Sequence, residues 1–265
     1  MFYLRLIIVL ALVSSSVSLN AEPYQTGSKE TSLVKKSQAR KQQTGWFYGA
    51  FTSINSSYYA GVGADTVALP IIGYIGTRFS FLGPRASYII HQSAELEALA
   101  LITYKSVGYK PNDSKHLDGM TRRQNSLFGG LSTSLKKDRL SYTLSYLHDL
   151  QNHSGGQDFT LAMSYRYNYG PFFLTPKISL NYLDSAYSNY YFGVRDHESN
   201  SDRQAYTPNT SINPSVSLNF ATPIFLKGFT RASVTHSWLD SSLYNSPIVN
   251  NKNHWKVNLS FTRFF

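Results

Sequence analysis

HWKVNLSFTRFF, residues 254–265, ends the chain with apolar and polar side chains in alternation. The apolar and aromatic members of the series are Trp255, Val257, Leu259, Phe261 and Phe265. Successive side chains of a β-strand point to opposite faces, so this period of two predicts a strand with one apolar face. A chain end usually frays unless a sheet holds it. The last strand is therefore predicted to pair with another strand as far as Phe265.

The same period of two recurs upstream in RLSYTLSYLHDL (139–150), QDFTLAMSYRYNYG (157–170) and SINPSVSLNF (211–220). Aromatic residues make up 15% of the chain, with 20 Tyr and 16 Phe. Aromatic side chains suit a pleated, half-buried surface, so the composition also favours strands over helices. These features together predict an all-β fold.

Three further features place the predicted strands in a membrane. Their lengths of about 10 to 14 residues exceed those usual in soluble sheets and approach the length that crosses a bilayer at a tilt. Tyr and Phe lie toward the strand ends, where aromatic rings favour the lipid headgroup region. Short connections at 136–139, 169–171 and 225–229 alternate with long ones at 108–122, 187–210 and 241–253. This arrangement is typical of bacterial outer-membrane barrels.

The fold predicted is a transmembrane antiparallel up-and-down β-barrel of about twelve strands, with ten as the alternative. The twelve expected ranges are 46–54, 70–75, 77–82, 84–91, 96–107, 123–136, 139–150, 157–169, 172–186, 211–223, 229–240 and 254–265. Ranges 77–82 and 70–75 are too short to span alone, and the Gly and Pro of GTRFSFLGPR (76–85) are equally compatible with bulges in fewer, longer strands. In hydrocarbon every backbone polar group must be paired, so the last strand must pair with the first.

The N-terminus predicts export from the cytoplasm. Arg5 precedes the apolar run Leu6–Val13 and a small, polar stretch, which is the layout of a signal peptide over 1–21. Cleavage is expected after Ser18 or Ala21. Residues 22–44 are polar and rich in Lys and Arg, and are expected to form a basic periplasmic arm before the barrel at 45–265. The chain has no cysteine, so disulfides do not stabilise it.

Two clusters were considered for chemistry. His148, Asp149 and His153 lie near Ser154, but no nucleophile motif surrounds them, and polar residues are ordinary in external loops. The second cluster consists of Asp196, His197, Glu198 and Asp202. It lacks the spacing of a zinc site or an EF-hand. The sequence therefore predicts a non-enzymatic protein with no catalytic, metal or cofactor site.

The net charge of +10 is common in nucleic-acid-binding proteins, but export argues against that partner. The anions expected instead are outer-membrane lipopolysaccharide and cell-wall polymers. Four cations fall on the polar face that should line the lumen: Arg166, Lys177, Arg231 and Lys256. A barrel of ten to twelve strands is wider than the eight-stranded type that side chains fill. A narrow pore that favours anions is one possible function.

Several segments resemble the MipA/OmpV family of outer-membrane proteins over residues 45–265. Examples are ALPIIGYIGTRFSFLGPRASY (68–88) and LTPKISLNYLDSAYSNYYFGV (174–194). The most specific segments are Leu117–Arg123, Tyr190–Val194 and Ser246–Val249. Their candidate functional residues are Leu117, Asp118, Gly119, Met120, Arg123, Tyr190, Tyr191, Gly193, Val194, Ser246, Pro247, Ile248 and Val249.

The resemblance implies a non-enzymatic barrel in the cell outer membrane. The family's namesake is regarded as a scaffold that joins a lytic murein transglycosylase to a penicillin-binding protein, and these are the partners implied here. Other members are described as porin-like or adhesive, which gives the alternative function of a small channel or adhesin. The terminal alternating strand also resembles the signal read by the barrel insertion machinery, although Arg263 stands where an apolar residue is usual.

Overall fold

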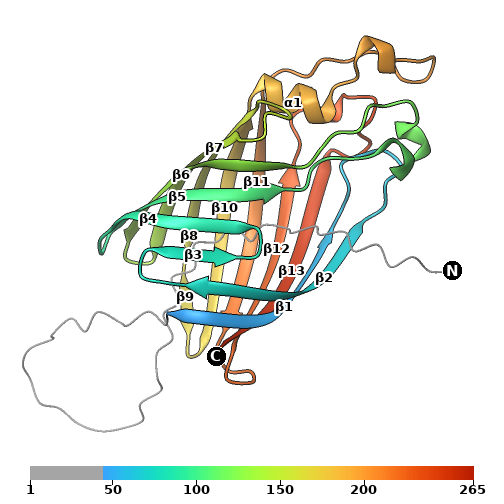
Figure 1. The fold of residues 1–265 in the computed structure, drawn as a ribbon. Coiled ribbons are helices and arrows are strands. Elements are labelled where there is room, and N and C mark those ends of the chain that lie inside the picture. Colours follow the sequence, from blue (N-terminus) through green and yellow to red (C-terminus); the bar gives the residue numbers. More distant parts are fainter. Residues whose placement is uncertain (1–43) are drawn as a thin grey trace, which may run out of the picture.

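The computed structural model describes residues 44–265, which form one closed barrel (Figure 1). The expected signal peptide (1–21) and all of the expected arm (22–44) except Thr44 lie outside the described residues. The strands are β1 Gly45–Asn55, β2 Asp65–Ile75, β3 Phe79–Leu82, β4 Arg85–Gln92, β5 Leu96–Lys105, β6 Ser126–Lys137, β7 Leu140–Asp149, β8 Gln157–Tyr165, β9 Tyr167–Tyr169, β10 Phe172–Leu183, β11 Ser211–Thr222, β12 Phe229–Trp238 and β13 Asn253–Phe264.

Neighbouring strands pair antiparallel in chain order, and β13 closes the ring by pairing with β1 from Phe47↔Phe264 to Asn55↔Lys256. The segments β8 and β9 are one strand interrupted at Arg166, since both pair with β10. At the interruption the N–H of Arg166 donates to the carbonyl of Arg139 at 2.9 Å. The barrel thus has twelve strands, which confirms the main prediction, and the alternative of ten is wrong.

The two faces of the wall differ as the alternation predicts. Outward side chains are large, apolar and exposed; Leu144 is 57% exposed and Leu259 is 52% exposed. Inward side chains on the same strands are mostly small and polar, and Ser217 and Asn258 are buried. Surfaces of this kind are stable only against hydrocarbon, so the outer face is the lipid-facing one.

Several strand boundaries differ from those predicted. The second strand begins at Asp65 rather than at 70, because Asp65–Ile75 pairs with β1 along its whole length. The strand β6 begins at Ser126 rather than at 123. Finally, β10 ends at Leu183 rather than at 186, since the Asp184 carboxylate accepts from the N–H of Tyr187 at 2.8 Å and starts a helix.

Helices occur only in the connections between strands in the described part of the chain. They are α1 Ser185–Phe192, α2 Ser241–Tyr244 and three 3-10 turns, η1 Pro111–Asp113, η2 Lys115–Leu117 and η3 Asp196–Glu198. Among residues 44–265, no helix combines the length and the apolar character needed to cross a membrane.

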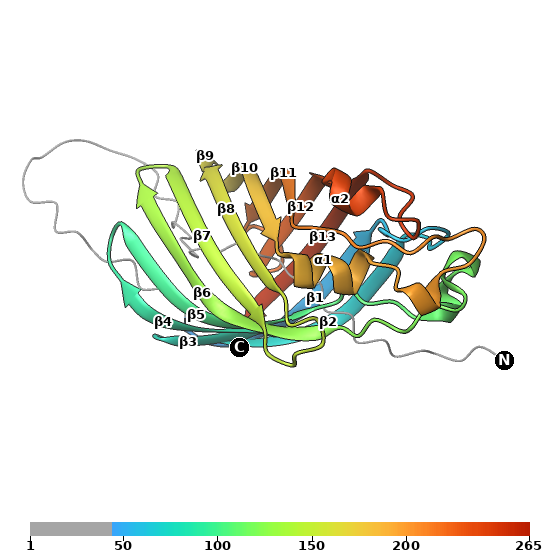
Figure 2. The same ribbon diagram turned by 90° about the horizontal axis from the view of Figure 1, so that it is seen from above.

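Connections at the two ends of the barrel differ in length. At one end lie the start of β1, the end of β13 and short turns, such as 138–139 between β6 and β7. This end is assigned to the periplasm. The other end carries the long connections 56–64, 106–125, 184–210 and 239–252 and is external. Viewed from above, the wall of β10 to β13 faces the wall of β3 to β5 across the lumen (Figure 2).

Candidate functional site: the external cap and the lumen

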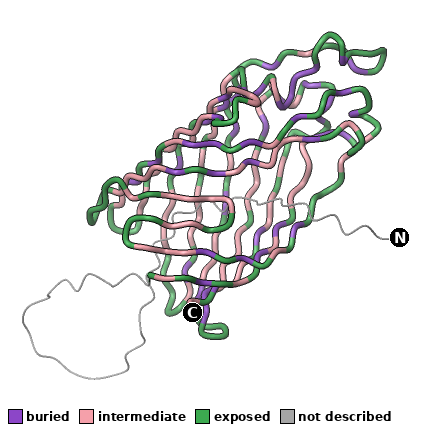
Figure 3. Tube along the Cα trace, viewed as in Figure 1, coloured by how far each residue is buried: buried purple, intermediate pink, exposed green. Residues whose placement is uncertain are grey.

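The four long external connections pack together into one structure, here called the cap. Its hydrophobic core contains buried residues from every connection: Tyr59, Tyr109, Leu117, Met120, Tyr187, Tyr191, Phe192, Val194, Leu239, Leu243, Ile248 and Val249. Buried segments are accordingly seen in the loops beyond the strand ends (Figure 3). Leu117, Tyr191 and Ile248 are 0% exposed, so the three segments singled out from the sequence meet in this core.

Hydrogen bonds join these segments directly. The Tyr59 hydroxyl bonds with the carbonyls of Val107 at 2.8 Å and Tyr191 at 3.2 Å. The Ser246 hydroxyl donates to the carbonyl of Phe192 at 2.5 Å, which ties the last connection to α1. Asp118, Gly119 and Pro247 are exposed and lie outside the core. Most of the motif residues therefore have a structural place in the cap.

A buried ion pair lies at the centre of the cap. The Arg123 guanidinium donates to both carboxylate oxygens of Glu198 at 2.8 Å, and each residue is 2% exposed. Arg123 also donates to the carbonyls of Tyr190 at 2.6 Å and Thr121 at 2.8 Å. A two-pronged contact of this kind fixes position as well as charge. It locks the connection 106–125 onto the connection 184–210.

The electrostatics of Glu198 follow from this contact. Burial by itself raises the pKa of Glu198, but hydrogen bonds from Arg123 and from the N–H groups of Arg195 and Thr121 lower this pKa to about 2. The carboxylate is therefore ionised at all physiological pH values. Glu198 was predicted only as a member of a loop cluster, and its pairing with Arg123 could not be predicted because 75 residues separate the two.

We expect the cap to loosen in acid. The folded-state pKa of Glu198, about 2, lies below the ordinary value of 4.5, so its ionisation contributes stability that is fully present above about pH 4.5. This contribution is lost as the pH falls through about 2. Hydrogen exchange of the cap amides should accelerate over that interval in the native protein, and Glu198→Gln should remove most of this pH dependence. An unchanged acid profile in Glu198→Gln would contradict the assignment.

Arg203 provides a second buried cation that the sequence analysis missed. Its guanidinium donates to the carbonyls of His116 at 2.7 Å, Asp118 at 2.8 Å and Glu198 at 2.8 Å. The residue satisfies carbonyl groups that would otherwise lack donors inside the cap. Arg203 is one of two arginines in the connection 184–210, and its local sequence does not reveal this role.

A polar layer lies directly beneath the cap. Lys105 from β5 forms a buried ion pair with Asp158 from β8, and Asn181 from β10 donates to the same carboxylate at 2.5 Å. The Lys105 ammonium also lies over the rings of Phe128 at 4.4 Å and Tyr187 at 5.0 Å. The layer connects three strands to the cap core, so the cap is fastened to the wall beneath it.

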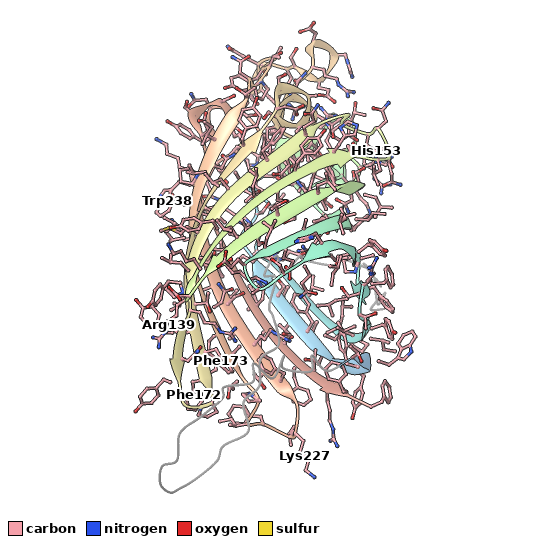
Figure 4. The ribbon with its side chains drawn as sticks, turned by 90° about the vertical axis from the view of Figure 1, so that its left-hand side faces the viewer. Arg139, His153, Phe172, Phe173, Lys227 and Trp238 are labelled. Carbon is pink, nitrogen blue, oxygen red and sulfur yellow. The ribbon has the colours of Figure 1, made fainter. Side chains whose placement is uncertain are left out.

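Below this layer the lumen is cationic. Residues of opposite parity on the same strands, Tyr167, Ile178, Val234 and Trp255, are exposed on the outer face. Arg166, Lys177, Arg231 and Lys256 therefore point into the barrel. Arg166 lies over the ring of Phe173 at 4.6 Å, near the periplasmic end, where Phe173 and Lys227 are seen in Figure 4. Arg231 donates to the Thr262 hydroxyl at 3.3 Å.

The lumen acids Asp158 and Glu97 are each paired with a lysine. Asp158 is paired with Lys105, and Glu97 is paired with Lys136 at 3.2 Å. Arg85 of β4 also faces the lumen, close enough to Lys177 for the two positive charges to repel each other. The described lumen therefore attracts anions.

Residues 48–265 match the family described as MltA-interacting protein MipA, a range that contains the whole cap and almost the whole wall. The chain belongs to this MipA family. It is 28% identical over 212 residues to the MltA-interacting protein of Escherichia coli K12, covering 76% of this chain and 82% of that protein. It is 26% identical over 204 residues to the outer membrane protein YiaT of the same strain, covering 76% and 83%.

Two further matches are an outer-membrane protein and a solved outer-membrane channel. Outer membrane protein OmpV of Vibrio cholerae is 25% identical over 164 residues, covering 62% of this chain and 64% of that protein. An outer membrane channel from Pseudomonas putida F1 aligns with 88% of this chain and 100% of its own at a TM-score of 0.40 and 10% identity. The MipA family membership confirms the predicted resemblance, and the protein is an outer-membrane β-barrel.

The His148, Asp149 and His153 cluster does not form a catalytic arrangement in this MipA family barrel. Asp149 is 2% exposed and accepts hydrogen bonds from Ser126, from both the N–H and the hydroxyl of Ser154, and from Gln151. The hydrogen bonds to this carboxylate hold the turn 150–156 in place. The Nδ1 of His153 instead lies 3.1 Å from the carbonyl of Asn125 (Figure 4 labels His153).

The acidic loop cluster is also divided. Glu198 turns into the cap toward Arg123, whereas Asp196, His197 and Asp202 are exposed. Within residues 44–265, no group of three or more His, Asp or Glu side chains is placed to hold a metal ion.

The terminal strand has the register predicted for an insertion signal. Trp255, Leu259 and Phe265 are exposed on the lipid face, with Val257 and Phe261 on the same side. The ring of Phe265 lies 5.0 Å from that of Tyr48 in β1, at the periplasmic interface. Arg263 pairs with Tyr48 on this same outer face.

Deletion of Phe265 is expected to lower the amount of protein in the outer membrane and to raise periplasmic degradation products. The deletion removes an interfacial aromatic anchor and the residue that the insertion machinery is expected to read. Phe265→Tyr keeps the ring and should be close to normal. Cell fractionation followed by immunoblotting measures both variants, and equal levels for the deletion and the native chain would contradict the assigned role.

Proposed function

We propose that the protein is a non-enzymatic scaffold of the outer membrane that holds a lytic murein transglycosylase, and through it a penicillin-binding protein, at the periplasmic surface. A MipA family relative is named MltA-interacting protein, which supports this partner class. The buried polar groups of the external motifs are already hydrogen-bonded within the cap. The partner is therefore proposed to bind at the periplasmic end.

The observation that carries the proposal is a cationic periplasmic rim. The exposed cations at the short turns and strand ends are Arg78, Lys137, Arg139, Lys227 and Arg263. The exposed acids at the same end of the described chain are Glu95 and Asp138. A surface with this excess of positive charge favours association with an acidic face of a partner and makes that association sensitive to salt.

Binding of the purified transglycosylase to the full mature protein in nanodiscs tests the scaffold. The triple variant Lys137→Glu, Arg139→Glu, Lys227→Glu should weaken binding at least about tenfold, since opposing charges become repulsive. The matched control, Lys110→Glu, Lys115→Glu, Arg122→Glu, makes the same charge change on exposed external residues and should bind normally. Equal binding by both variants, or none by the native protein, would overturn the proposal.

A small anion channel is the second candidate, and the cationic lumen with neutralised acids favours it. In planar bilayers we expect small conductance steps with a preference for anions. Arg166→Glu and Lys256→Glu should each reduce that preference, because they reverse charges that face the lumen. Lys110→Glu in the external connection is the control and should leave selectivity unchanged. Silent bilayers with protein of confirmed fold would reject the channel.

A further inference from the structure

One part of the barrel wall lacks a complete set of neighbours. The strand β2 pairs with β1 over Asp65–Ile75, but with β3 only over Gly73–Ile75. The hairpin of β3 and β4 turns at Gly83 and Pro84, far short of the cap (Figure 1). We call the edge of Asp65–Ile72 on this side the notch; within residues 44–265, backbone pairing of this stretch runs to β1 alone.

The direction of each backbone group at the notch follows from the register. The carbonyl of Trp46 accepts from Phe265, so even-numbered residues of β1 point toward β13 and odd-numbered ones toward β2. Odd-numbered residues of β2 therefore point back to β1. Gly76, which donates to Phe79 of β3, confirms that even-numbered ones point the other way. The groups at the open edge belong to Thr66, Ala68, Pro70 and Ile72.

This edge is unsuited to pairing with another strand. Pro70 has no N–H to offer, and its position at the open edge is the one that strands allow proline. Asp65 places an exposed carboxylate at the external end of the same strand. Proline and charge are devices that protect open strand edges from strand addition. The occupant of the notch is therefore not a strand of a second copy or of a partner protein.

The lumen behind the notch is apolar. Phe51, Val67, Ile71 and Leu101 point inward and are each no more than 7% exposed. Phe51 is in β1 and Val67 and Ile71 are in β2, whereas Leu101 of β5 lies next to Ser87 of the β3–β4 hairpin. The far wall differs, since Asn213, Ser215, Ser217 and Asn219 of β11 face the lumen there. Two further apolar side chains on the lumen face remain accessible, since Leu69 of β2 is half-buried and Leu82 at the hairpin tip is 40% exposed. An accessible apolar pair beside a polar lumen suits a molecule with a hydrocarbon part.

A cation lies at the lower end of the notch. Arg85 is paired with Leu82 and with the buried, inward Thr103, and Leu82 is in turn opposite Gly73. Directly opposite residues share a face, so Arg85 points into the lumen one row below Ile72. Lys177 lies across the lumen from it. An anionic group near Arg85 relieves the repulsion between these two cations.

We propose that the notch is a lateral opening through which a single-chain anionic amphiphile passes between the outer leaflet and the lumen. Its hydrocarbon chain lies along Leu69 and Leu82, and its head group binds Arg85. The packed cap above the notch makes the side of the wall, rather than the external end, the shorter path. The proposal does not depend on the scaffold function.

Photolabelling with dodecanoate that carries a diazirine in its chain tests the opening, with the full mature protein in phosphatidylcholine nanodiscs. Label should appear on β2 and on the β3–β4 hairpin at residues that face the lumen, such as Leu69 and Leu82. Unlabelled dodecanoate and dodecyl phosphate should compete, whereas dodecanol and dodecyltrimethylammonium should compete poorly. Competition by only one anion identifies the head group. Label found only on lipid-facing residues such as Ile102 and Leu131 would overturn the proposal.

Two variants test the two parts of the site. Arg85→Gln should weaken competition by dodecanoate about tenfold, the loss expected for one charge-assisted hydrogen bond. Arg263→Gln, an exposed cation outside the lumen, is its control. Two residues added on each side of the Gly83–Pro84 turn should lengthen the hairpin over the notch and slow labelling severalfold. The same insertion at Asp138–Arg139 is the matched control.

Heat-modified mobility in gels shows whether each variant retains a closed barrel. If the insertion variant unfolds, hydrogen exchange of the native protein provides the test instead. The amides of Thr66, Ala68 and Ile72 should exchange fast, and dodecanoate should protect them. Exchange as slow as that of Val67 and Ile71 would overturn the opening. The periplasmic rim variant should label normally, so failure of the scaffold and failure of the opening are distinguishable.

Discussion

Arg123→Ala is expected to destabilise the external cap by about 3 to 5 kcal/mol, the usual result of removing one partner of a buried ion pair. The variant leaves the Glu198 carboxylate in a site that is 2% exposed, where the N–H groups of Thr121 and Arg195 donate to it but no cation balances its charge. Hydrogen exchange and limited proteolysis of the connections 106–125 and 184–210 should both accelerate. The barrel wall should keep its heat-modified mobility, since its pairing does not involve this contact.

Matched variants separate the ion pair from general damage to the loop. Arg122→Ala changes the exposed neighbour of Arg123 and should alter cap stability by less than about 0.5 kcal/mol. The double variant Arg123→Met, Glu198→Leu removes both charges, and should recover much of the loss because no buried charge is left unpaired. If Arg122→Ala and Arg123→Ala behave alike, the ion pair does not hold the cap.

Leu259→Arg is expected to impair insertion strongly, whereas Ser260→Arg should have a smaller effect. Leu259 is 52% exposed on the lipid face, where an arginine near the midplane costs about 2 to 4 kcal/mol. Ser260 faces the lumen, where the added cation stays hydrated. Amounts in the outer membrane and unfolding in urea with phospholipid vesicles measure the difference.

The lumen comparison needs a second position, because Ser260 lies opposite Arg231 and the two cations would repel each other. Ser215 lies opposite Ser179 and Ser237, so Ser215→Arg repeats the test without a facing cation. Equal insertion of Leu259→Arg and Ser215→Arg would mean that the register of the wall is displaced by one residue.

Much of the wall could be predicted from the sequence. The alternation in 254–265 assigned Leu259 and Trp255 to the outer face, and both are exposed there. The twelve strands and the positions of the long connections were also predicted. Each of these features depends on a period of two or on turn residues, which are local properties of the chain. The inward position of Lys256 follows from the same rule.

The exceptions in the wall are informative. The strand β2 continues to Asp65 although Pro70 and Gly73 weaken its local signal, because pairing with β1 stabilises it. The interruption at Arg166 has no clear local signal either, and depends on the contact with the carbonyl of Arg139. In both places the neighbouring strand, rather than the residue itself, decides the backbone.

The sequence by itself determined the barrel, its lipid-facing side chains and the cations of its lumen, since alternation places every second residue on one face. Only the tertiary structure decided that Arg123 pairs with Glu198, that Asp149 holds a turn, and that the short β3–β4 hairpin leaves the edge of Asp65–Ile72 open. Loops carry no period, so contacts between connections that lie far apart in the chain cannot be derived from spacing. They arise when a closed wall brings the strand ends together and the buried charges of the loops must find partners.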